Sequence, residues 1–170
     1  MPGKPSPPAS TGALAYTVPV ILVTDSESAL CCTTARDFAV IGGLVTNRYA
    51  IRWSALGDAT DFPQPATDDA RAKQAGQQSF PTEFGWVTGL AGNDFYMYVF
   101  QERAISKSTY VGGDVVWSFD TFEEDRGCVR MGRLAQIDDK VFFQSDRGYH
   151  VVENDQIADI GYGIIDDTYS

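Results

Sequence analysis

The chain has 170 residues, of which 44% are hydrophobic, 12% aromatic and 21% charged, and this composition is typical of a folded domain and excludes disorder for most of the chain. Its formal net charge is −10 with scattered lysines and arginines, so we expect no sequence-specific nucleic-acid binding. No apolar run approaches the roughly 20 residues of a membrane-spanning helix, so we expect no membrane partner.

The beginning of the chain is rich in proline, and we divide the sequence into a flexible arm at residues 1–12 and a single β domain at residues 13–170. The arm lacks the apolar stretch of a secretory signal. Residues 13–24 have a strand-like composition, and an extended segment readily adds to an exposed sheet edge of a neighbouring subunit. We therefore expect the arm and this segment to exchange between subunits of an oligomer.

Short runs of β-branched and aromatic residues, separated by Gly, Asn and Asp, predict a mostly antiparallel β structure. Residues 48–54 alternate between apolar and polar or small side chains, which predicts a strand with one buried face. Residues 95–101 are apolar on both faces, which predicts a central strand. The expected strands are Phe38–Gly42, Arg48–Ser54, Phe95–Gln101, Ala104–Val111, Val115–Phe119, Val141–Gln144 and Tyr149–Glu153.

Residues 63–80 interrupt this pattern because they are polar and rich in Ala and Gln. Two interpretations stay open for them, a long surface loop or a short helix near Asp68–Ala75.

Three segments repeat one pattern, an Asp followed by a hairpin, and they start at Asp37, Asp94 and Asp139. The starts are spaced by 57 and then 45 residues, and the first interval contains the extra loop. A period near 45 is typical of the four-stranded blades of a β-propeller. The sequence therefore predicts an all-β fold of antiparallel hairpins in propeller-like blades. The propeller would be incomplete, since rings use about 4 to 8 blades, and a β-sandwich is the alternative.

Cys31, Cys32 and Cys128 are an odd number of cysteines, and two of them are sequence neighbours that pair badly with each other. They predict free thiols and assembly in a reducing cytoplasm.

Few residues suggest catalysis or metal binding. His150 is the one histidine in the sequence, so the chain lacks a multi-histidine metal site of its own. As the base of a Ser-His-Asp arrangement it would need a nucleophile, yet no Gly-x-Ser-x-Gly turn accompanies it. The acidic runs that could in principle cut glycosidic bonds are more typical of solvated turns. They comprise Asp120, Glu123, Glu124 and Asp125, and further on Asp166 and Asp167.

The remaining turn motifs have simple structural interpretations, and no EF-hand spacing is present. Ser145 to Gly148 is similar to part of the Asp-box turn of sialidase-like propellers. The simpler interpretation is that Asp146 caps a tight turn while Gly148 takes positive φ, with a bulge. Gly57-Asp58, Thr60-Asp61 and Gly112 to Asp114 are expected to be turns, because they lack the strand-loop-helix context of a phosphate loop. We therefore expect no enzyme activity, catalytic residue, cofactor or metal.

Four ordered motifs between Arg36 and Thr168 resemble the tail hub or nozzle proteins of short-tailed bacteriophages, although members of that family carry more sequence before these motifs. The motifs are Ile51 to Phe62 (IRWSALGDATDF), Phe100 to Gly113 (FQERAISKSTYVGG), Phe119 to Gly132 with RGC at its centre, and Val141 to Val152 (VFFQSDRGYHVV).

The resemblance implies a structural virion protein with a β-propeller-like region. It also implies a homo-oligomeric ring below the portal and adaptor proteins, which retains packaged DNA and lets it pass at ejection. An acidic lumen would suit such a conduit, because like charge prevents tight DNA binding. The expected location is the phage tail, after assembly in the host cytoplasm. A glycan-binding or carbohydrate-active β-protein and a capsid decoration protein are the alternatives.

Overall fold

The computed structural model describes residues 28–160. The predicted arm, the strand-like segment at 13–24 and the Asp166-Asp167 pair lie outside these described residues.

The described chain forms three four-stranded sheets. The first contains β1 (Cys31–Ala35), β2 (Phe38–Gly42), β3 (Ala50–Trp53) and β4 (Gly76–Ser79). The second contains β5 (Val87–Gly92), β6 (Tyr96–Gln101), β7 (Ile105–Tyr110) and β8 (Trp117–Glu123). The third contains β9 (Leu134–Ile137), β10 (Lys140–Ser145), β11 (Gly148–Glu153) and β12 (Gln156–Ile160). A short helix, α1 (Asp68–Ala72), and a 3-10 helix (Thr82–Phe84) lie in the connections.

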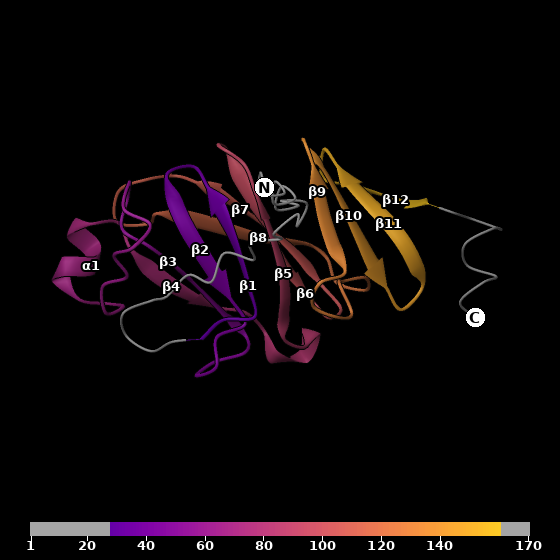
Figure 1. Ribbon diagram of the computed structural model, residues 1–170, viewed down its shortest axis with the longest axis horizontal. Coiled ribbons are helices and arrows are strands. Elements are labelled where there is room, and N and C mark those ends of the chain that lie inside the picture. The colour runs from indigo at the N-terminus through magenta and orange to yellow at the C-terminus, as the bar shows by residue number, and fades with distance from the viewer. Residues whose placement is uncertain (1–27, 161–170) are drawn as a thin grey trace, which may run out of the picture.

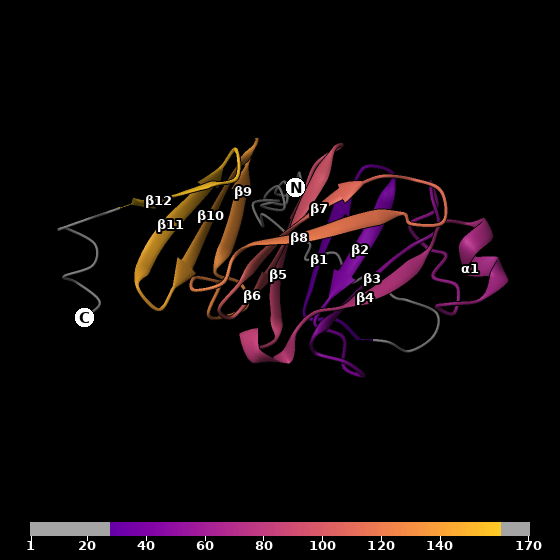
Figure 2. The same cartoon turned by 180° about the vertical axis from the view of Figure 1, so that it is seen from behind.

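Each sheet is an antiparallel meander in which consecutive strands are neighbours. The three sheets stand side by side with the second in the middle, and α1 lies at the far end of the first (Figure 1). The view from behind gives the same order, with the third sheet at the other end (Figure 2). The first strands of successive sheets meet, because β5 contacts both β1 and β9. This open stack of blades confirms the predicted all-β, propeller-like fold.

The repeated hairpin pattern is also confirmed. The three predicted hairpins are the inner strand pairs β2–β3, β6–β7 and β10–β11. The prediction missed five strands, and each lies at the edge of its sheet: β1, β4, β5, β9 and β12. The edge strand β4 (GQQS), for example, contains no apolar residue. Pairing with β3, rather than its own composition, makes it a strand.

The prediction of one buried face for residues 48–54 is wrong. All four residues of β3 are buried, and the Arg52 side chain is only 3% exposed. Its guanidinium Nη2 donates to the carbonyl oxygens of Phe62 at 2.6 Å and Pro63 at 2.8 Å. The chain after β3 thus folds back over the outer face of the first sheet, which local periodicity does not reveal.

Both interpretations of residues 63–80 are right in part, since residues 63–67 form a loop and a short helix follows them. The helix forms as α1, where the Thr67 hydroxyl accepts a hydrogen bond from the Ala70 amide at 3.2 Å. The segment after it is not a loop, because Gly76–Ser79 forms β4 and pairs with β3.

The described residues form three hydrophobic clusters, and two of them join neighbouring sheets. One lies between the first and second sheets and contains Phe38, Trp53 and Trp117. Another lies between the second and third sheets and contains Phe100 and Phe143, whose ring centroids are 5.2 Å apart. The last covers the outer side of the first sheet and comprises Ala39, Ile41, Leu44, Ala50 and Phe62.

Candidate assembly surface and buried polar network

The third sheet turns one face towards the second sheet and the other away from it. Val141, Phe143 and Val152 are buried on the inner face. Because side chains alternate along a strand, their sequence neighbours lie on the opposite face. The register places Phe142 beside Ala135 and Val151, and Val151 beside Ala158. We call this outer surface the open face, and it comprises Ala135, Ile137, Phe142, Val151, Ala158 and Ile160.

None of the open-face residues belongs to a hydrophobic cluster of the described chain. Ile137 is 61% exposed, and Phe142 and Val151 are half-buried. A hollow of about 290 Å³ lies at one end of the face and is lined by Ala135, Phe142 and Gln144 among others. An apolar row of this kind across a whole sheet is typical of a surface that another layer covers.

The charged residues of the open face lie around its apolar row. Lys140 Nζ is 3.4 Å from Glu153 Oε2, and both side chains are about half exposed. The Arg133 guanidinium donates to the Gln144 side chain at the other end of β10. Exposed Asp138 and Asp146 lie in the turns at the ends of β10, so the border of this face carries charges of both signs.

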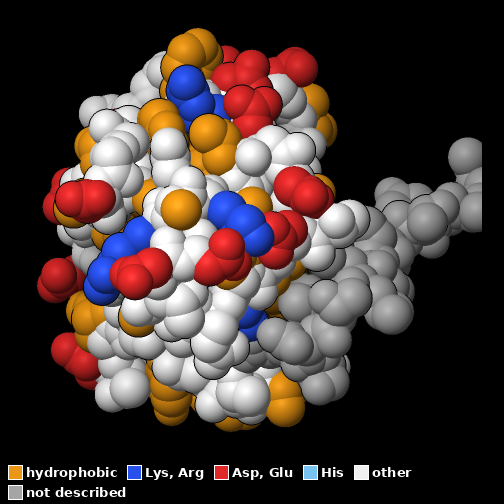
Figure 3. Space-filling model, turned by 90° about the vertical axis from the view of Figure 1, so that its left-hand side faces the viewer, with side chains coloured by type: hydrophobic (Ala, Val, Ile, Leu, Met, Phe, Trp, Pro, Cys, Tyr) orange, Lys and Arg blue, Asp and Glu red, His pale blue; other side chains and the backbone are white. Residues whose placement is uncertain are grey.

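At the opposite end of the stack, the loop 55–63 and α1 form a surface that we call the cap end (Figure 3). The loop is held by backbone hydrogen bonds from Leu56 to Lys73 and from Gly57 to Asp37. Phe62, which is 5% exposed, fills the outer cluster of the first sheet. The GDATDF motif is therefore a structural loop that closes this sheet.

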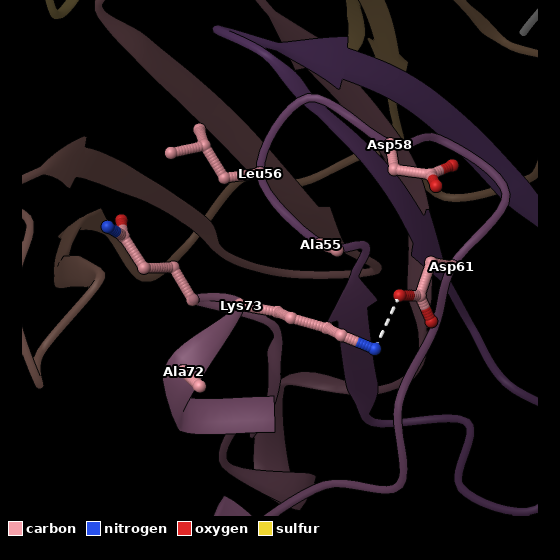
Figure 4. Close-up of a pocket in the computed structure, with 7 residues that line it drawn as sticks. Ala55, Leu56, Asp58, Asp61, Ala72 and Lys73 are labelled. Carbon is pink, nitrogen blue, oxygen red and sulfur yellow. Dashed lines mark ion pairs between the residues drawn. The ribbon is translucent and has the colours of Figure 1, made fainter. Parts of the chain in front are cut away.

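Acidic side chains and one lysine surround a hollow of about 400 Å³ at the cap end. Lys73 reaches across it to Asp61, with a Nζ–Oδ2 distance of 2.9 Å (Figure 4). Hydrogen bonds to Asp61 and then to Asp69 raise the pKa of Lys73. The side chain and amide of Thr60 donate to Asp58 and lower the pKa of that carboxyl. These residues confirm the predicted turn at Gly57 to Asp61.

Ser145, His150 and Asp159 form a hydrogen-bonded chain in the third sheet. The Ser145 Oγ–His150 Nε2 distance is 2.6 Å, and the His150 Nδ1–Asp159 Oδ1 distance is 2.7 Å. His150 was a candidate from the sequence, whereas neither of its partners was predicted. Hairpin register was the available signal, since His150 pairs with Asp159 across β11 and β12.

These three residues have the composition of a catalytic triad, but the serine lies where a nucleophile is hard to reach. Ser145 and His150 are each 3% exposed. The Ser145 oxygen also accepts a hydrogen bond from the Arg147 amide at 2.9 Å, and Ser145 lines neither of the hollows described above. A nucleophilic serine needs space for a carbonyl and donors for its oxyanion. The arrangement instead satisfies buried polar groups within the sheet.

The same contacts correct the predicted turn between β10 and β11. Gly148 has positive φ (126°), as expected, but the Ser145 hydroxyl rather than the Asp146 carboxylate caps the turn. The predicted bulge is also absent, because the register continues from Gln144 and Tyr149 to Ser145 and Gly148 without a shift.

The acidic run at 120–125 makes ion pairs rather than an opposed carboxylate pair. Glu123 binds Arg126 at 3.1 Å, and Asp125 binds Arg147 at 2.7 Å. Arg126 Nη1 also lies 3.4 Å from Asp159 Oδ1. It therefore links the acidic run to the hydrogen-bonded network of Ser145, His150 and Asp159. The run therefore helps to attach the third sheet to the second.

The RGC motif lies at the junction between the second and third sheets. A Cβ atom on Gly127 would lie 2.1 Å from the Gln101 carbonyl oxygen, so only glycine fits there. Cys128 is fully buried, its amide donates to Gln101, and its carbonyl accepts from the Thr88 hydroxyl at 2.6 Å. The motif thus fixes the connection between β8 and β9 against the second sheet.

A second polar contact between these sheets centres on Asp155. Its carboxylate accepts from the Tyr98 hydroxyl at 2.7 Å and lies 2.6 Å from Lys107 Nζ. Partial burial acts to raise the pKa of Asp155, but the hydrogen bonds from Lys107 and Tyr98 outweigh it and lower that pKa. Burial followed by the contact with Asp155 raises the pKa of Tyr98.

All three cysteines carry free thiols, as predicted. Burial raises the pKa of Cys31 to about 12 and also raises those of Cys32 and Cys128. These thiols therefore stay protonated near neutral pH, which makes them poor nucleophiles and metal ligands.

Residues 28–160 contain no group of three or more His, Cys, Asp or Glu side chains arranged to hold a metal ion. The helices of the same range are too short and too polar to cross a membrane. No protein-family model matches the chain, and no curated protein matches it in sequence.

Proposed function

We propose that this chain is a structural subunit of a bacteriophage tail, a hub or nozzle component that assembles with copies of itself into a ring. The observation that carries the proposal is the structural role of the four motifs on which the resemblance rests. Residues 51–62 cap the first sheet, and residues 100–113 form the middle of the second. Residues 119–132 fix the junction to the third sheet, and residues 141–152 form the β10–β11 hairpin. All four build and join blades, which is what a mechanical role requires.

The open face supports assembly because it is apolar and points away from the second sheet. A further layer could pack on it in the way that the third sheet packs on the second. In the proposed ring, copies form a tube under the portal and adaptor proteins. The net charge of −10 suits a wall that DNA passes without adhering to it. In this proposal the chain performs no catalysis.

The test is to purify virus particles from cells that express the chain with its native neighbouring genes, and to locate it by immunogold labelling and cryo-electron microscopy. We expect label and matching side-chain density at the tail. Label spread over the capsid would support the decoration-protein alternative and overturn the tail role. Absence of the chain from particles would overturn any virion role.

Glycan binding is a second candidate function, favoured by the hollow on the open face. Phe142 offers an aromatic surface there, with Arg133 and Gln144 beside it as hydrogen-bonding groups. Sugars bind to aromatic faces flanked by such polar groups. A glycan array probed with the labelled chain tests this candidate, and binding that the Phe142→Ala variant loses would favour it over the tail role.

A further inference from the structure

The free edges of the three sheets differ in how they are protected. The first strands β1, β5 and β9 meet in the middle of the stack. The last strands β4, β8 and β12 each have one neighbouring strand, so each leaves one edge unpaired among residues 28–160. Asp120 is exposed on β8, whose register with β7 shifts at Ile105, and β12 carries the carboxylate of Asp159. Charges and register breaks of this kind discourage an edge from pairing with another chain.

The edge of β4 has none of these protecting features. Its four residues are uncharged and contain no proline, and its register with β3 runs without a shift. Gln77, Gln78 and Ser79 are exposed. In Figure 2, β4 lies at the margin of the first sheet. It is therefore the least protected free edge in the part of the chain that the structure describes.

The hydrogen bonds around β4 show which backbone groups point out of the sheet. The amide of Phe80, the residue after the strand, donates to the Tyr49 carbonyl at 2.8 Å. Because successive residues of an antiparallel strand direct their backbone groups to opposite sides, Gln78 faces β3 as Phe80 does. Gln77 and Ser79 therefore direct their N–H and C=O groups away from β3. The outward Ser79 carbonyl accepts a hydrogen bond from the exposed Gln78 side chain at 2.8 Å.

A second copy of β4 matches this outward pattern. In an antiparallel pair centred on Gln78, Gln77 of each copy lies opposite Ser79 of the other, so every outward N–H meets an outward C=O. The two Gln78 side chains then lie opposite each other. A primary amide both donates and accepts hydrogen bonds, so identical amides complement each other. Two copies of β8 or of β12 would instead bring carboxylates together.

The charges near β4 do not form a block of one sign. The helix α1 and the residue after it carry two acidic side chains, Asp68 and Asp69, and two basic ones, Arg71 and Lys73. Glu83 follows the strand at its other end. The net charge of −10 repels two copies at long range, and salt screens such repulsion. Pairing through β4 is therefore expected to strengthen as the salt concentration rises.

We propose that β4 pairs with β4 of a second copy of this chain, antiparallel and about a two-fold axis at Gln78, so that the two first sheets become one continuous sheet. The contact uses the same surface on both copies and closes as a dimer. It does not rest on the proposed function, because a ring needs a further contact through another surface. A strand this short buries little area, so we expect a dissociation constant on the order of 100 µM.

The main experiment places opposite charges at the centre of the pair. Gln78→Lys and Gln78→Glu each put like charges opposite each other, and each is expected to weaken dimerisation at least about fivefold. A mixture of the two variants is expected to form a mixed dimer at least as tight as the parent dimer, because the charges then attract. Analytical ultracentrifugation from about 10 µM to about 1 mM measures the affinities. Native mass spectrometry with one variant labelled with heavy nitrogen identifies the mixed dimer.

Two further sets of variants control for net charge and for folding. Gln156→Lys and Gln156→Glu make the same changes at an exposed glutamine of β12, and we expect both to leave dimerisation close to that of the parent. Gln77→Pro removes one outward N–H and no hydrogen bond to β3, so dimerisation is expected to fall at least about tenfold. Circular dichroism and thermal melting check that every variant is folded.

Four results overturn the inference. They are a parent chain that stays monomeric at about 1 mM, a mixture of the Gln78 variants that associates no better than either alone, Gln156 variants that weaken association as much as the Gln78 variants, and association that salt weakens. The second result would mean that β4 pairs with another segment, such as the chain before residue 28. None of these measurements uses virus particles, so a chain absent from virions that still dimerises through β4 would retain the inference and reject the tail role.

Discussion

The first and third sheets both pack against the second, yet they are attached in different ways. Aromatic rings dominate the first contact, where Phe38 lies 5.5 Å from Trp117 and Phe80 lies 5.5 Å from Phe119. Polar groups border the second contact, through Asp155 on one side and Asp159 on the other. Apolar contacts are insensitive to pH, whereas contacts through carboxylates depend on their ionisation. We therefore expect the third sheet to be the more easily detached.

The largest expected effect tests the difference between a covered and an open outer face. Phe62→Ala removes the ring that covers the first sheet, and we expect a loss of about 3 kcal/mol in the free energy of unfolding. The matched variant Phe142→Ala, on the open face, is expected to cost about 1 kcal/mol or less in the monomer. Urea denaturation measures both values. Equal losses would contradict the view that only one end is covered.

The next effect concerns the junction between the second and third sheets. Gly127→Ala forces a Cβ atom against the backbone of residues 101–104, so we expect a loss of about 2 kcal/mol or more. Gly113→Ala serves as control, because its Cβ would meet no atom within 4 Å and its cost comes only from the positive φ of 66°. That cost is about 1 kcal/mol. Hydrogen exchange is expected to show the Gly127 change mainly as faster exchange in β9 to β12.

A smaller effect is expected for the buried hydrogen-bonded network of Ser145, His150 and Asp159. Ser145→Ala removes the hydroxyl that hydrogen-bonds to His150 Nε2 and accepts from the Arg147 amide, and we expect a loss of about 1 to 2 kcal/mol measured by chemical denaturation. If the triad is structural, no ester or amide hydrolysis accompanies the parent chain or the variant. Hydrolysis by the parent that the variant lacks would instead identify Ser145 as a nucleophile.

The smallest effect is a pH dependence at Asp155. A carboxyl with a lowered folded-state pKa stabilises the fold above its unfolded pKa of about 3.9. That stability is lost as the pH falls through the lower pKa of the folded state. Asp155→Asn is expected to cost below about 1 kcal/mol at neutral pH, since the group is partly exposed. The free energy of unfolding of the variant should also fall less steeply than that of the parent as the pH drops from about 4 to roughly 2.

Urea titrations across this pH range compare the variant with the parent and with Asp114→Asn. Asp114 lies in the β7–β8 turn and makes no ion pair among the described residues. A slope unchanged by Asp155→Asn would show that the contact with Tyr98 and Lys107 does not hold the third sheet.

The sequence predicted the inner hairpins because their side chains carry a strong apolar signal. It missed the edge strands because residues such as Gln77 and Gln78 become a strand only beside Ile51 and Arg52. The burial of Arg52 depends on a loop that folds back from beyond the end of β3. The Ser145–His150–Asp159 chain and the open face likewise depend on register and stacking, which are long-range properties. The tail role itself stays a proposal based on resemblance.

Each sheet is built from one continuous length of chain, and this has a consequence for how the protein is made. Residues 31–79 leave the ribosome before the other two sheets, but Val40, Ile51 and Trp53 of that first sheet need the second sheet for burial. The third sheet then has a finished surface to fold upon. Folding can therefore proceed in the order of synthesis, with each sheet stabilised by the arrival of the next.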